Sequence, residues 1–387
     1  MADHVRVVIV GGGVIGLATA LHLVQSGEVQ VSLLEAQHVG VGSSGRSVGI
    51  VETQYLDPFD IEMRVIGRRF VEGLAQDHGL RYTRNGYLRL AHNLDDLERY
   101  EASVETQKSF GIMDARVLDR AGLQRLIPEM RCEDRVGGLF GAGDGYVDGY
   151  LYTSLLRDIA VGKGVTVHQG TRLIGAEERR DGCLRISTNR DDFNADVVVN
   201  AAGPWAAAVG DLLGAPLPIS NQRHQAVLVH LRSALAYVMP SVMDYVPGEG
   251  RDGLYFRHER ADQLVAGLHN EQPIRDHEQG DAEAADLEVD WEFLSSVATL
   301  LSERLPGVGD AALGKGWAGL YPMSIDGQPI VGPHPYRTNV VCAAGAGGNG
   351  IQLSAAIGRL AAEWILHGTP SNPLSQSKWG AHRVVGF

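Results

Sequence analysis

Three glycines near the amino terminus have the spacing that binds the pyrophosphate of a dinucleotide. Residues 11–16 read GGGVIG and fit the pattern G-x-G-x-x-G. Gly11 makes the tight turn, Gly13 lets backbone amides reach the pyrophosphate, and Gly16 lets the helix and strand pack closely. Further on, Glu35 can accept hydrogen bonds from both ribose hydroxyls, and its charge would repel a 2′-phosphate. This spacing predicts a dinucleotide site.

The elements around these residues have the order that such a site requires. Val5–Val10 is a short apolar run rich in β-branched residues, which is typical of a buried parallel strand. A helical stretch follows as far as Gln25, and a second strand, Val29–Leu34, leads into Glu35. Because the helix begins at the glycines, its unpaired N–H groups and partial positive charge would face the pyrophosphate.

Two further loops are rich in small residues. Gly42–Ser47 (GSSGRS) offers the hydroxyls of Ser43 and Ser44 as donors. Gly345–Gly350 holds four glycines in six residues and precedes a helical stretch, Ile351–Leu366. Glycine lets backbone approach a ligand where side chains would block it, and amides at a helix start stabilise negative charge. Both loops are therefore candidates for the walls of the same site.

The composition narrows the possible partners and surroundings. A net charge of −13 argues against nucleic acid or an anionic membrane as a partner. Cys132, Cys183 and Cys342 lie far apart without a CxxC pair, so we expect no disulfide framework, no metal site and a reducing, cytoplasmic setting. No apolar run approaches the roughly 18–20 residues of a membrane span.

The pattern of apolar residues changes in the second half of the chain. Between about Leu217 and Gly267 it alternates with a period of two, which is typical of antiparallel strands. Helical character returns at Ile351–Leu366, after the second glycine-rich loop. The chain therefore reads as a nucleotide-binding domain at both ends with an antiparallel domain inserted between, and the carboxyl-terminal part returns to the nucleotide.

In five segments, taken in order, the chain resembles the FAD-dependent amine and amino-acid oxidase family of glycine oxidase, monomeric sarcosine oxidase, the sarcosine oxidase β subunit and D-amino-acid oxidase. These segments are 11–35, 42–47, 144–148 (DGYVD), 200–205 (NAAGPW) and 317–350, which contains DGQPIVG. The resemblance implies FAD and an α/β chain (α+β overall), in which a Rossmann-type FAD-binding domain carries an inserted antiparallel β-sheet substrate domain. We expect the FAD-binding domain at 1–83, 140–216 and 313–387, and the substrate-binding domain at 84–139 and 217–312.

The matched segments also imply which residues contact the cofactor. The cysteine that carries FAD covalently in monomeric sarcosine oxidase falls near Gly319, so the resemblance implies non-covalent FAD. The implied cofactor-binding residues are Gly11, Gly13, Val14, Ile15, Gly16, Glu35, Ala36, Gly42, Ser43, Ser44, Arg46, Ser47, Leu173, Ala202, Gly203, Gly319, Gly347, Gly348, Asn349, Gly350, Ile351 and Gln352.

The family's anchors for a substrate carboxylate are missing from this chain. Positions that carry arginine or lysine in those relatives hold Glu52, Tyr321, Gly348 and Gln352 here. Either another basic residue binds a carboxylate, or the substrate is not a simple α-amino acid. Arginines that could take over are Arg46, which could equally contact the pyrophosphate, Arg223 and Arg257.

Other positions matched to the family's substrate pocket suggest catalytic and binding roles. Tyr255 aligns with a pocket tyrosine and His269 with an active-site histidine, and with Tyr321 they are the candidate catalytic residues. The alternative for Tyr255 is an aromatic side chain that only packs in a sheet. The alternative for His269 is a histidine at a strand end whose hydrogen bonds are made within the protein. If Glu52 faces the pocket, it would favour a cationic group on the substrate. The alternative is that Glu52 is exposed and forms a surface ion pair.

The resemblance implies oxidation of the C–N bond of an amine or N-alkyl amino acid by hydride transfer to flavin, which gives an imine that water hydrolyses. One alternative is oxidation of a 2-hydroxy acid, for which His269 would be the base. Another is the FAD subunit of a heteromeric dehydrogenase, and a homo- or hetero-oligomer stays open. Oxygen or another compound accepts the electrons. Val265 replaces a lysine that promotes oxygen reactivity in monomeric sarcosine oxidase, which favours an electron acceptor other than oxygen.

Overall fold

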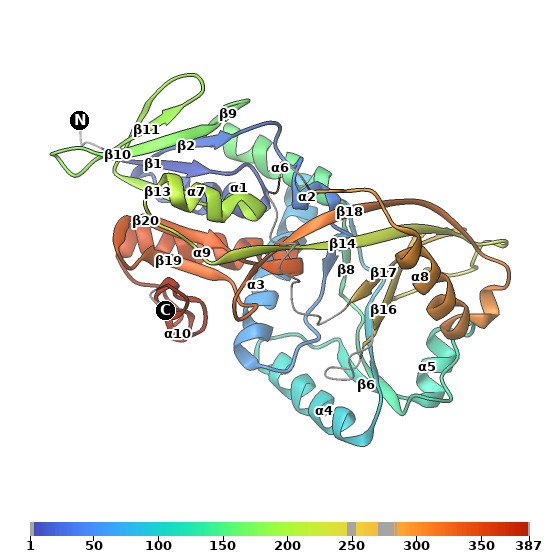
Figure 1. Ribbon diagram of the computed structural model, residues 1–387. Helices are drawn as coiled ribbons and strands as arrows, with labels where there is room; N and C mark the ends of the chain where they lie inside the picture. Colours follow the sequence, from blue (N-terminus) through green and yellow to red (C-terminus); the bar gives the residue numbers. More distant parts are fainter. Residues whose placement is uncertain (1–3, 246–252, 270–281, 283–284, 386–387) are drawn as a thin grey trace.

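The computed structural model describes residues 4–245, 253–269, 282 and 285–385, which form two connected parts (Figure 1). One part is built around a six-stranded sheet and the other around an eight-stranded sheet. No helix in the described residues is long and apolar enough to cross a membrane. The mixed α/β architecture, with a dinucleotide-type part and an antiparallel part, confirms the predicted fold class.

The six-stranded sheet gathers strands from both ends and the middle of the chain. Strand β1 is central and runs parallel to β2 and β13, while β19 is antiparallel at one edge. In sheet order the strands are β19 (Ile330–His334), β20 (Arg337–Ala344), β13 (Val197–Asn200), β1 (Val5–Val10), β2 (Val29–Glu35) and β9 (Thr166–Gln169).

Alternate residues of β1 enter two different hydrophobic cores. Val7 and Ile9 pack with helices α1 (Val14–Val24) and α9 (Gly350–His367) on one face. Val8 and Val10 pack on the other face, in a second buried cluster. A strand that is buried on both faces explains the unbroken apolar run in the sequence. The predicted strand, helix and second strand at the amino terminus are confirmed.

The eight-stranded sheet forms the second part of the molecule. Its strands β14 and β18 pair antiparallel along most of their length and run as a long ribbon out of the first part (Figure 1). In sheet order the strands are β18 (Ala312–Ser324), β14 (Ile219–His230), β17 (Gln263–His269), β16 (Gly253–Arg260), β15 (Ser241–Asp244), β5 (Tyr87–Ala91), β7 (Gly137–Gly141) and β6 (Ala115–Asp119).

Helices cover this sheet unequally. Helices α5 (Arg120–Leu126) and α8 (Trp291–Arg304) contribute to the apolar core on one face. On the other face, α3 (Pro58–His78) and α4 (Leu94–Ser109) cover the β5–β7 end. The β18–β14–β17–β16 end of that second face borders the cavity described below.

Strand membership crosses the predicted domain boundaries at two places, at β7, whose last two residues fall in the predicted FAD-binding segment 140–216, and at β18. The prediction assigned residues 313–387 to the FAD-binding domain, but β18 pairs with β14 in the eight-stranded sheet. Its alternating pattern could be read from the sequence, whereas its partner could not. The strand thus joins the two parts.

The remaining elements are short or lie at the edges of these two sheets. They are β3 (Ile50–Val51), β4 (Tyr82–Thr83), β8 (Gly145–Val147), β10 (Leu173–Glu178), β11 (Leu184–Thr188), β12 (Phe193–Ala195), α2 (Ser43–Arg46), α6 (Gly149–Gly162), α7 (Ala206–Leu212), α10 (Ser375–Trp379) and 3₁₀ turns at Gly203–Trp205, Pro306–Val308, Gly347–Asn349 and Ala381–Arg383.

Two glycines fix the position of helix α9. A Cβ on Gly67 of α3 would lie 1.8 Å from the carbonyl oxygen of Gln352, and a Cβ on Gly358 would lie 2.7 Å from the Ala18 carbonyl carbon in α1. Neighbouring helices therefore touch α9 backbone to backbone at these points. This packing sets where the amino-terminal end of α9 meets the rest of the molecule.

We expect Gly67→Ala to destabilise the protein by about 1–3 kcal/mol, because the added methyl group must push α3 away from α9. Gly73→Ala is the matched control on the same helix, since a Cβ there meets nothing within 4 Å. The control should be neutral or more stable by up to about 1 kcal/mol. Denaturant unfolding checks both variants, and equal stability of the two would contradict the packing argument.

Candidate active site

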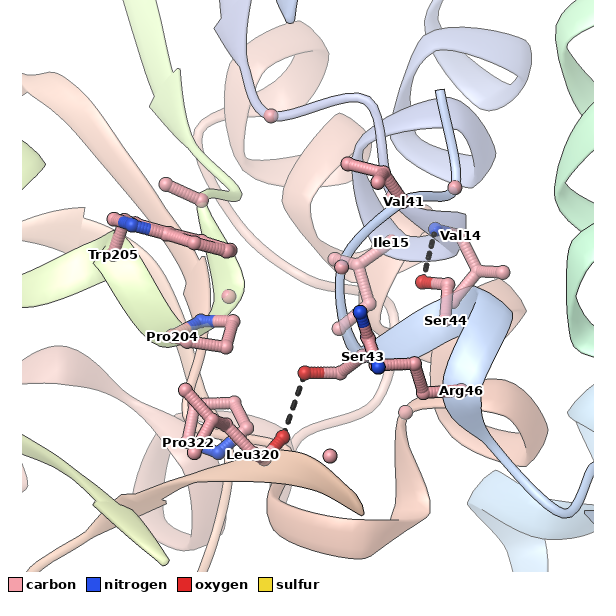
Figure 2. Close-up of a pocket in the computed structure, with 18 of the residues that line it drawn as sticks. Val14, Ile15, Val41, Ser43, Ser44, Arg46, Pro204, Trp205, Leu320 and Pro322 are labelled. Atoms are coloured by element: carbon pink, nitrogen blue, oxygen red, sulfur yellow. Dashed lines mark hydrogen bonds between the residues drawn. The ribbon is translucent and has the colours of Figure 1, made fainter. Parts of the chain in front are cut away.

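A cavity of about 300 Å³ lies where the two sheets meet, within the size range of ligand pockets. The start of α1, the α2 segment, the start of α9 and strands β14, β16 and β18 all contribute to its lining. Figure 2 shows Ile15, Ser44 and Arg46 on one side, with Trp205 and Pro322 on the other. The cavity is therefore shared between the dinucleotide-type part and the antiparallel sheet.

At one end of the cavity, the first glycine loop has the tight geometry that its sequence predicted. Gly11 has φ +115°, and a Cβ there would lie 2.3 Å from the Ala201 carbonyl oxygen. A Cβ on Gly16 would lie 2.1 Å from the Gly11 carbonyl oxygen. Gly13 precedes α1 and has no side chain to cap it, and Ser44 accepts the Val14 N–H, so the N–H groups of Ile15 and Gly16 are the ones left to a ligand.

Glu35 lies at the carboxyl end of β2 and lines the cavity beside this loop. One carboxylate oxygen accepts the Gly12 N–H at 2.9 Å and the other accepts the Gln37 N–H at 2.8 Å. Each carboxylate oxygen has a further lone pair, so the carboxylate is held in place and can still accept from ribose hydroxyls.

The α2 segment connects the two sides of the cavity. The Ser44 hydroxyl oxygen accepts the Val14 N–H at 3.1 Å, and the Ser43 hydroxyl donates to the Leu320 carbonyl oxygen at 2.6 Å (Figure 2). Arg46 donates to the Ala318 carbonyl oxygen at 3.3 Å. These contacts link the start of α1 to strand β18.

The remaining predicted cofactor residues on this wall come from segments far apart in the chain. Ala202 and Gly203 follow β13, while Leu173 begins β10, and all three line the cavity. Trp205 lies beside them, and its ring is 3.4 Å from the position of a Cβ on Gly42. An apolar slot with a flat aromatic wall fits an adenine ring.

At the other end of the cavity, α9 begins without a side-chain cap and without an acidic residue in its first turn. The side chain of Asn349 is used elsewhere, because its Oδ1 accepts from the Tyr55 hydroxyl at 3.0 Å and from Gln352 Nε2 at 2.9 Å. Gly347, Gly348 and Gly350 line the cavity at this end. Uncapped amides and a helix dipole fit a ring that becomes anionic on reduction.

Facing this loop is a wall of neutral aromatic side chains on the eight-stranded sheet. The rings of His224 and Tyr321 stack with centroids 3.8 Å apart. Tyr255 lies across Gly267, where a Cβ would come within 2.2 Å of its hydroxyl. All three aromatic residues line the cavity.

Burial keeps these side chains uncharged. Burial, with His269 nearby, lowers the pKa of His224 to about 3. Burial and Tyr55 raise the pKa of Tyr321 to about 12, and burial and Tyr321 raise the pKa of Tyr255 above its ordinary value. At neutral pH the wall therefore offers a neutral imidazole and two phenols that keep their protons.

Two of the missing family anchors are linked by packing. A Cβ on Gly348 would lie 2.3 Å from the Tyr321 ring. The tyrosine thus fills the space that an arginine at 348 would occupy. Similarly, a Cβ on Gly319 would lie 3.3 Å from the Arg46 Cβ, so Arg46 borders the position of the family's linking cysteine.

Several predicted site residues lie outside the cavity lining. Arg223 pairs with Asp290 at 3.0 Å, and Arg257 donates to the Val48 carbonyl oxygen at 2.9 Å and pairs with Glu259. His269 ends β17 and packs edge-on against Tyr245 at 4.5 Å. The engagement of both arginines with protein groups leaves Arg46 as the predicted candidate that lines the cavity.

Glu52 is also outside the lining, although it is only 2% exposed. Its carboxylate accepts the Gln54 N–H at 2.5 Å, and its own N–H donates to Gln352 Oε1 at 3.1 Å. Burial raises the pKa of Glu52, while Arg89 and Arg64 act in the opposite direction. Its predicted role in recognising a substrate cation stays a prediction.

The sequence interpretation missed His224 and three residues near Glu52: Tyr55, Arg64 and Arg89. His224 is opposite Gly319 on the paired strand β18. His224 lies two residues before Ala226, so the sequence places both side chains on the same face of a strand. The sequence does not show which face of that strand borders the cavity. Tyr55, Arg64 and Arg89 come from different elements, and only the fold brings them together.

The described residues contain no group of three or more His, Cys, Asp or Glu side chains that could hold a metal ion.

Two uncapped helix starts at the ends of one cavity, with a carboxylate for ribose and a neutral aromatic wall, define a dinucleotide-dependent oxidoreductase site. Residues 6–364 match the FAD dependent oxidoreductase (DAO) family, and the chain belongs to this family. The predicted family and FAD are confirmed.

Similar proteins agree with this assignment. The chain is 27% identical over 380 residues to mitochondrial sarcosine dehydrogenase from Mus musculus, covering 95% of this chain and 40% of that protein. It is 26% identical over 404 residues to mitochondrial dimethylglycine dehydrogenase from Rattus norvegicus, covering 97% and 45%. The chain thus spans less than half the length of these relatives.

A solved structure shows the same fold over the whole length. L-proline dehydrogenase from P. horikoshii superimposes with a TM-score of 0.85 at 21% identity, covering 99% of this chain and 98% of that one.

Gly13→Val should abolish retention of FAD, because a Cβ at this position already lies 3.2 Å from Ser44 Oγ and the valine methyl groups would enter the space in front of the α1 amides. Gly175→Val on β10 is the control, since a Cβ there meets nothing within 4 Å. The absorbance of flavin per purified chain measures the outcome. Full flavin content in Gly13→Val would show that this loop does not hold the cofactor.

The low pKa of His224 predicts a stability that depends on pH. Between its ordinary pKa of 6.5 and the folded value of about 3, the unfolded chain binds a proton that the folded chain does not. The free energy of unfolding therefore falls as pH falls from 6.5, by about 2 kcal/mol at pH 4.5 from this group. His224→Phe keeps a ring against Tyr321 and should lose less stability between pH 7 and pH 4.5. Parallel losses in denaturant unfolding would argue against a buried neutral imidazole.

Proposed function

We propose that this chain oxidises the C–N bond of an amine or N-alkyl amino acid. The observation that carries the proposal is the neutral wall of His224, Tyr321 and Tyr255 opposite the amides at the start of α9. Among the described residues that line the cavity, Glu35 is the sole carboxylate, and it lies at the ribose end. The substrate end therefore offers no anion to stabilise an ammonium group.

This charge pattern favours an uncharged amine, which is the form that can release hydride from the adjacent carbon. When bound, FAD supplies the acceptor for that hydride. The C–H bond breaks, its electron pair leaves as hydride, and the nitrogen lone pair forms the C=N bond of an iminium ion. Loss of the N–H proton to water then gives the imine. A neutral His224 can accept a hydrogen bond from the amine N–H and so orient its lone pair.

Water then adds to the imine carbon and gives a carbonyl product and an amine, so no side chain has to donate atoms. The phenols of Tyr255 and Tyr321 keep their protons and can donate hydrogen bonds to the substrate. Positioning and exclusion of water are the contributions of the protein.

Oxidation of a 2-hydroxy acid fits this site less well. That reaction needs a base for the hydroxyl proton. The imidazole in the cavity wall, that of His224, has its pKa lowered to about 3 and is a weak base at neutral pH. The relatives sarcosine dehydrogenase and dimethylglycine dehydrogenase are also named after substrates with a C–N bond.

The predicted cofactor residues are part of the same proposal. Ser43, Ser44 and Arg46 would enclose the middle of the FAD, and the start of α9 would face its ring. We propose non-covalent FAD, since Gly319 offers no side chain for a link. A reducing cytoplasmic setting fits three cysteines that form no disulfide among the described residues.

Electrons pass, in this proposal, to an acceptor other than oxygen. Val265 occupies the position of the family's oxygen-activating lysine and is 1% exposed on β17. Without a cation there, superoxide beside the flavin gains little stabilisation.

A panel of N-methyl amino acids, secondary amines and 2-hydroxy acids tests the reaction. We expect anaerobic bleaching of the flavin by one of the amines, turnover with an artificial dye, and slow oxygen uptake. FAD should be released when the protein is denatured. Bleaching by a hydroxy acid alone would replace the proposed reaction, and rapid oxygen uptake would overturn the choice of acceptor.

A further inference from the structure

Arg89, on strand β5, is a half-buried arginine whose terminal nitrogens have no hydrogen-bond partner in the part of the chain that the structure describes. Its Nε donates to the Gln54 carbonyl oxygen at 3.0 Å. Within the described residues, no acceptor is hydrogen-bonded to its two terminal nitrogens and no carboxylate lies within 4.0 Å of the guanidinium. The side chain is half-buried. A cation in this position can bind an anion, because protein interiors rarely hold a charge without a partner.

Arg89 and Arg64 lie outside the residues that line the cavity, but the register of the sheet places Arg89 on the cavity side. Arg89 is opposite Met243, which is opposite Tyr255, which is opposite Gly267. Residues that are directly opposite in neighbouring strands project from the same face. Arg89 and Tyr255 therefore share a face, two strand spacings or about 10 Å apart.

His224 and Tyr321 project from that face as well. Gly267 is opposite Ala226, and His224 lies two residues before Ala226 on β14. Tyr321 is opposite Gln222, two residues before His224. The free guanidinium thus lies on the same side of the sheet as the aromatic wall.

Arg64, on α3, also lies close to Tyr55. Its guanidinium carbon lies 3.2 Å from the centre of the Tyr55 ring, and that of Arg89 lies 5.3 Å from it. Arg64 Nη2 donates to Asn349 Oδ1 at 3.4 Å, and its buried Nε has no hydrogen-bond partner. Two guanidinium groups therefore lie near Tyr55, whose hydroxyl contacts the loop at the start of α9.

Nearby carboxylates do not occupy the terminal nitrogens of Arg89. Glu52 is the carboxylate whose charge raises the pKa of Arg89, against the effect of burial, yet it forms no ion pair with it. Asp60 pairs instead with Arg64, at 3.5 Å. Glu52 can thus balance the charge of Arg89 at a distance while the terminal nitrogens stay open to a ligand.

We propose that Arg89, with Arg64 near the same Tyr55 ring, binds the carboxylate of the substrate, so that the substrate of this chain is an amino acid rather than a simple amine. The inference rests on the proposed function for the identity of the reacting bond. It places the carboxylate anchor at new positions. The four positions that carry arginine or lysine in the relatives hold Glu52, Tyr321, Gly348 and Gln352 here. A planar guanidinium fork suits a carboxylate, which it can bind with two parallel hydrogen bonds.

This assignment reverses the charge preference expected from Glu52 alone. A carboxylate that accepts the Gln54 amide and lies near two arginines has little capacity left for a substrate cation. The substrate's amine would face Tyr255, and its carboxylate would point towards Arg89, whose long side chain can span part of the two strand spacings between them. The two groups of an amino acid would then meet side chains on the same face of the sheet.

Acetate and acetamide, which have the same shape and differ in charge, test the anchor without any turnover. We expect acetate to change the absorption spectrum of the bound flavin in a saturable way and acetamide to have no effect at the same concentration. Arg89→Gln should weaken acetate binding by about 10- to 100-fold, as expected for a lost charged hydrogen bond. Equal binding of the two probes by the wild-type protein would overturn the proposal.

Matched variants separate the anchor from a structural role. Arg116→Gln removes an exposed arginine on β6, the edge strand of the same sheet, and should bind acetate like the wild type. Arg89→Lys keeps the charge and should recover part of the acetate binding. If Arg89→Gln loses FAD, the proposal is tested by two other measurements: acetate binding to Arg89→Lys, and the ratio of acetate to acetamide binding in the wild type. An Arg89→Lys variant that does not bind acetate would overturn the proposal.

Kinetics with N-methylglycine and its amide distinguish this inference from the proposed reaction. Arg89→Gln should raise the KM for N-methylglycine by about 10- to 100-fold with a similar kcat at saturation, and should leave the amide unaffected. If the wild type oxidises the amide as well as the acid, C–N oxidation stands and the carboxylate anchor fails. If neither compound nor any other amine reduces the flavin while acetate still binds through Arg89, the anchor stands and the proposed reaction fails.

Discussion

The structure depends on close backbone contact between helix α9 and its neighbours. Gly67 and Gly358 allow α3 and α1 to touch α9 without intervening side chains. This contact fixes the start of α9 at one end of the cavity while the start of α1 forms the other. Backbone N–H groups would thus meet the cofactor at two points whose separation is set by helix packing, and neither point would rely on a flexible side chain. Interiors packed this tightly tolerate little displacement, so the cofactor geometry follows from the core.

The second sheet completes the site by facing those amides with side chains of controlled charge. Strand β18 is joined to the cofactor side through Ser43 and Arg46. Across this face of the sheet, neutral aromatic rings at β14, β16 and β18 give way, beyond the cavity lining, to a guanidinium at β5 that has no ion pair among the described residues. Burial lowers the pKa of His224 and therefore keeps that end uncharged. A substrate with one neutral and one anionic end matches this gradient better than a substrate with a single cation.

Much of the dinucleotide part could be predicted from sequence, because its constraints are local. The turn at Gly11, the helix after it and the carboxylate at Glu35 lie within one short stretch, and each has a steric or electrostatic reason. The substrate side depends on pairings between distant strands. Arg89 and Tyr255 are far apart in sequence, and they share a face only because β5, β15 and β16 are neighbours. Likewise, the fit of Tyr321 against Gly348 explains why anchors are absent at both positions, yet neither residue reveals it alone. The alternation of β14 could have drawn attention to His224, but the side of the strand that borders the cavity is a property of the fold.

The most direct test of the account is a crystal structure of the FAD-loaded protein with bound acetate, at a concentration that saturates the spectral change. We expect FAD to lie along the cavity, with its pyrophosphate at the start of α1 and its ring at the start of α9. We expect the acetate carboxylate to lie on the terminal nitrogens of Arg89. Acetate bound to Arg46 with Arg89 unoccupied, or a flavin ring away from the start of α9, would contradict it.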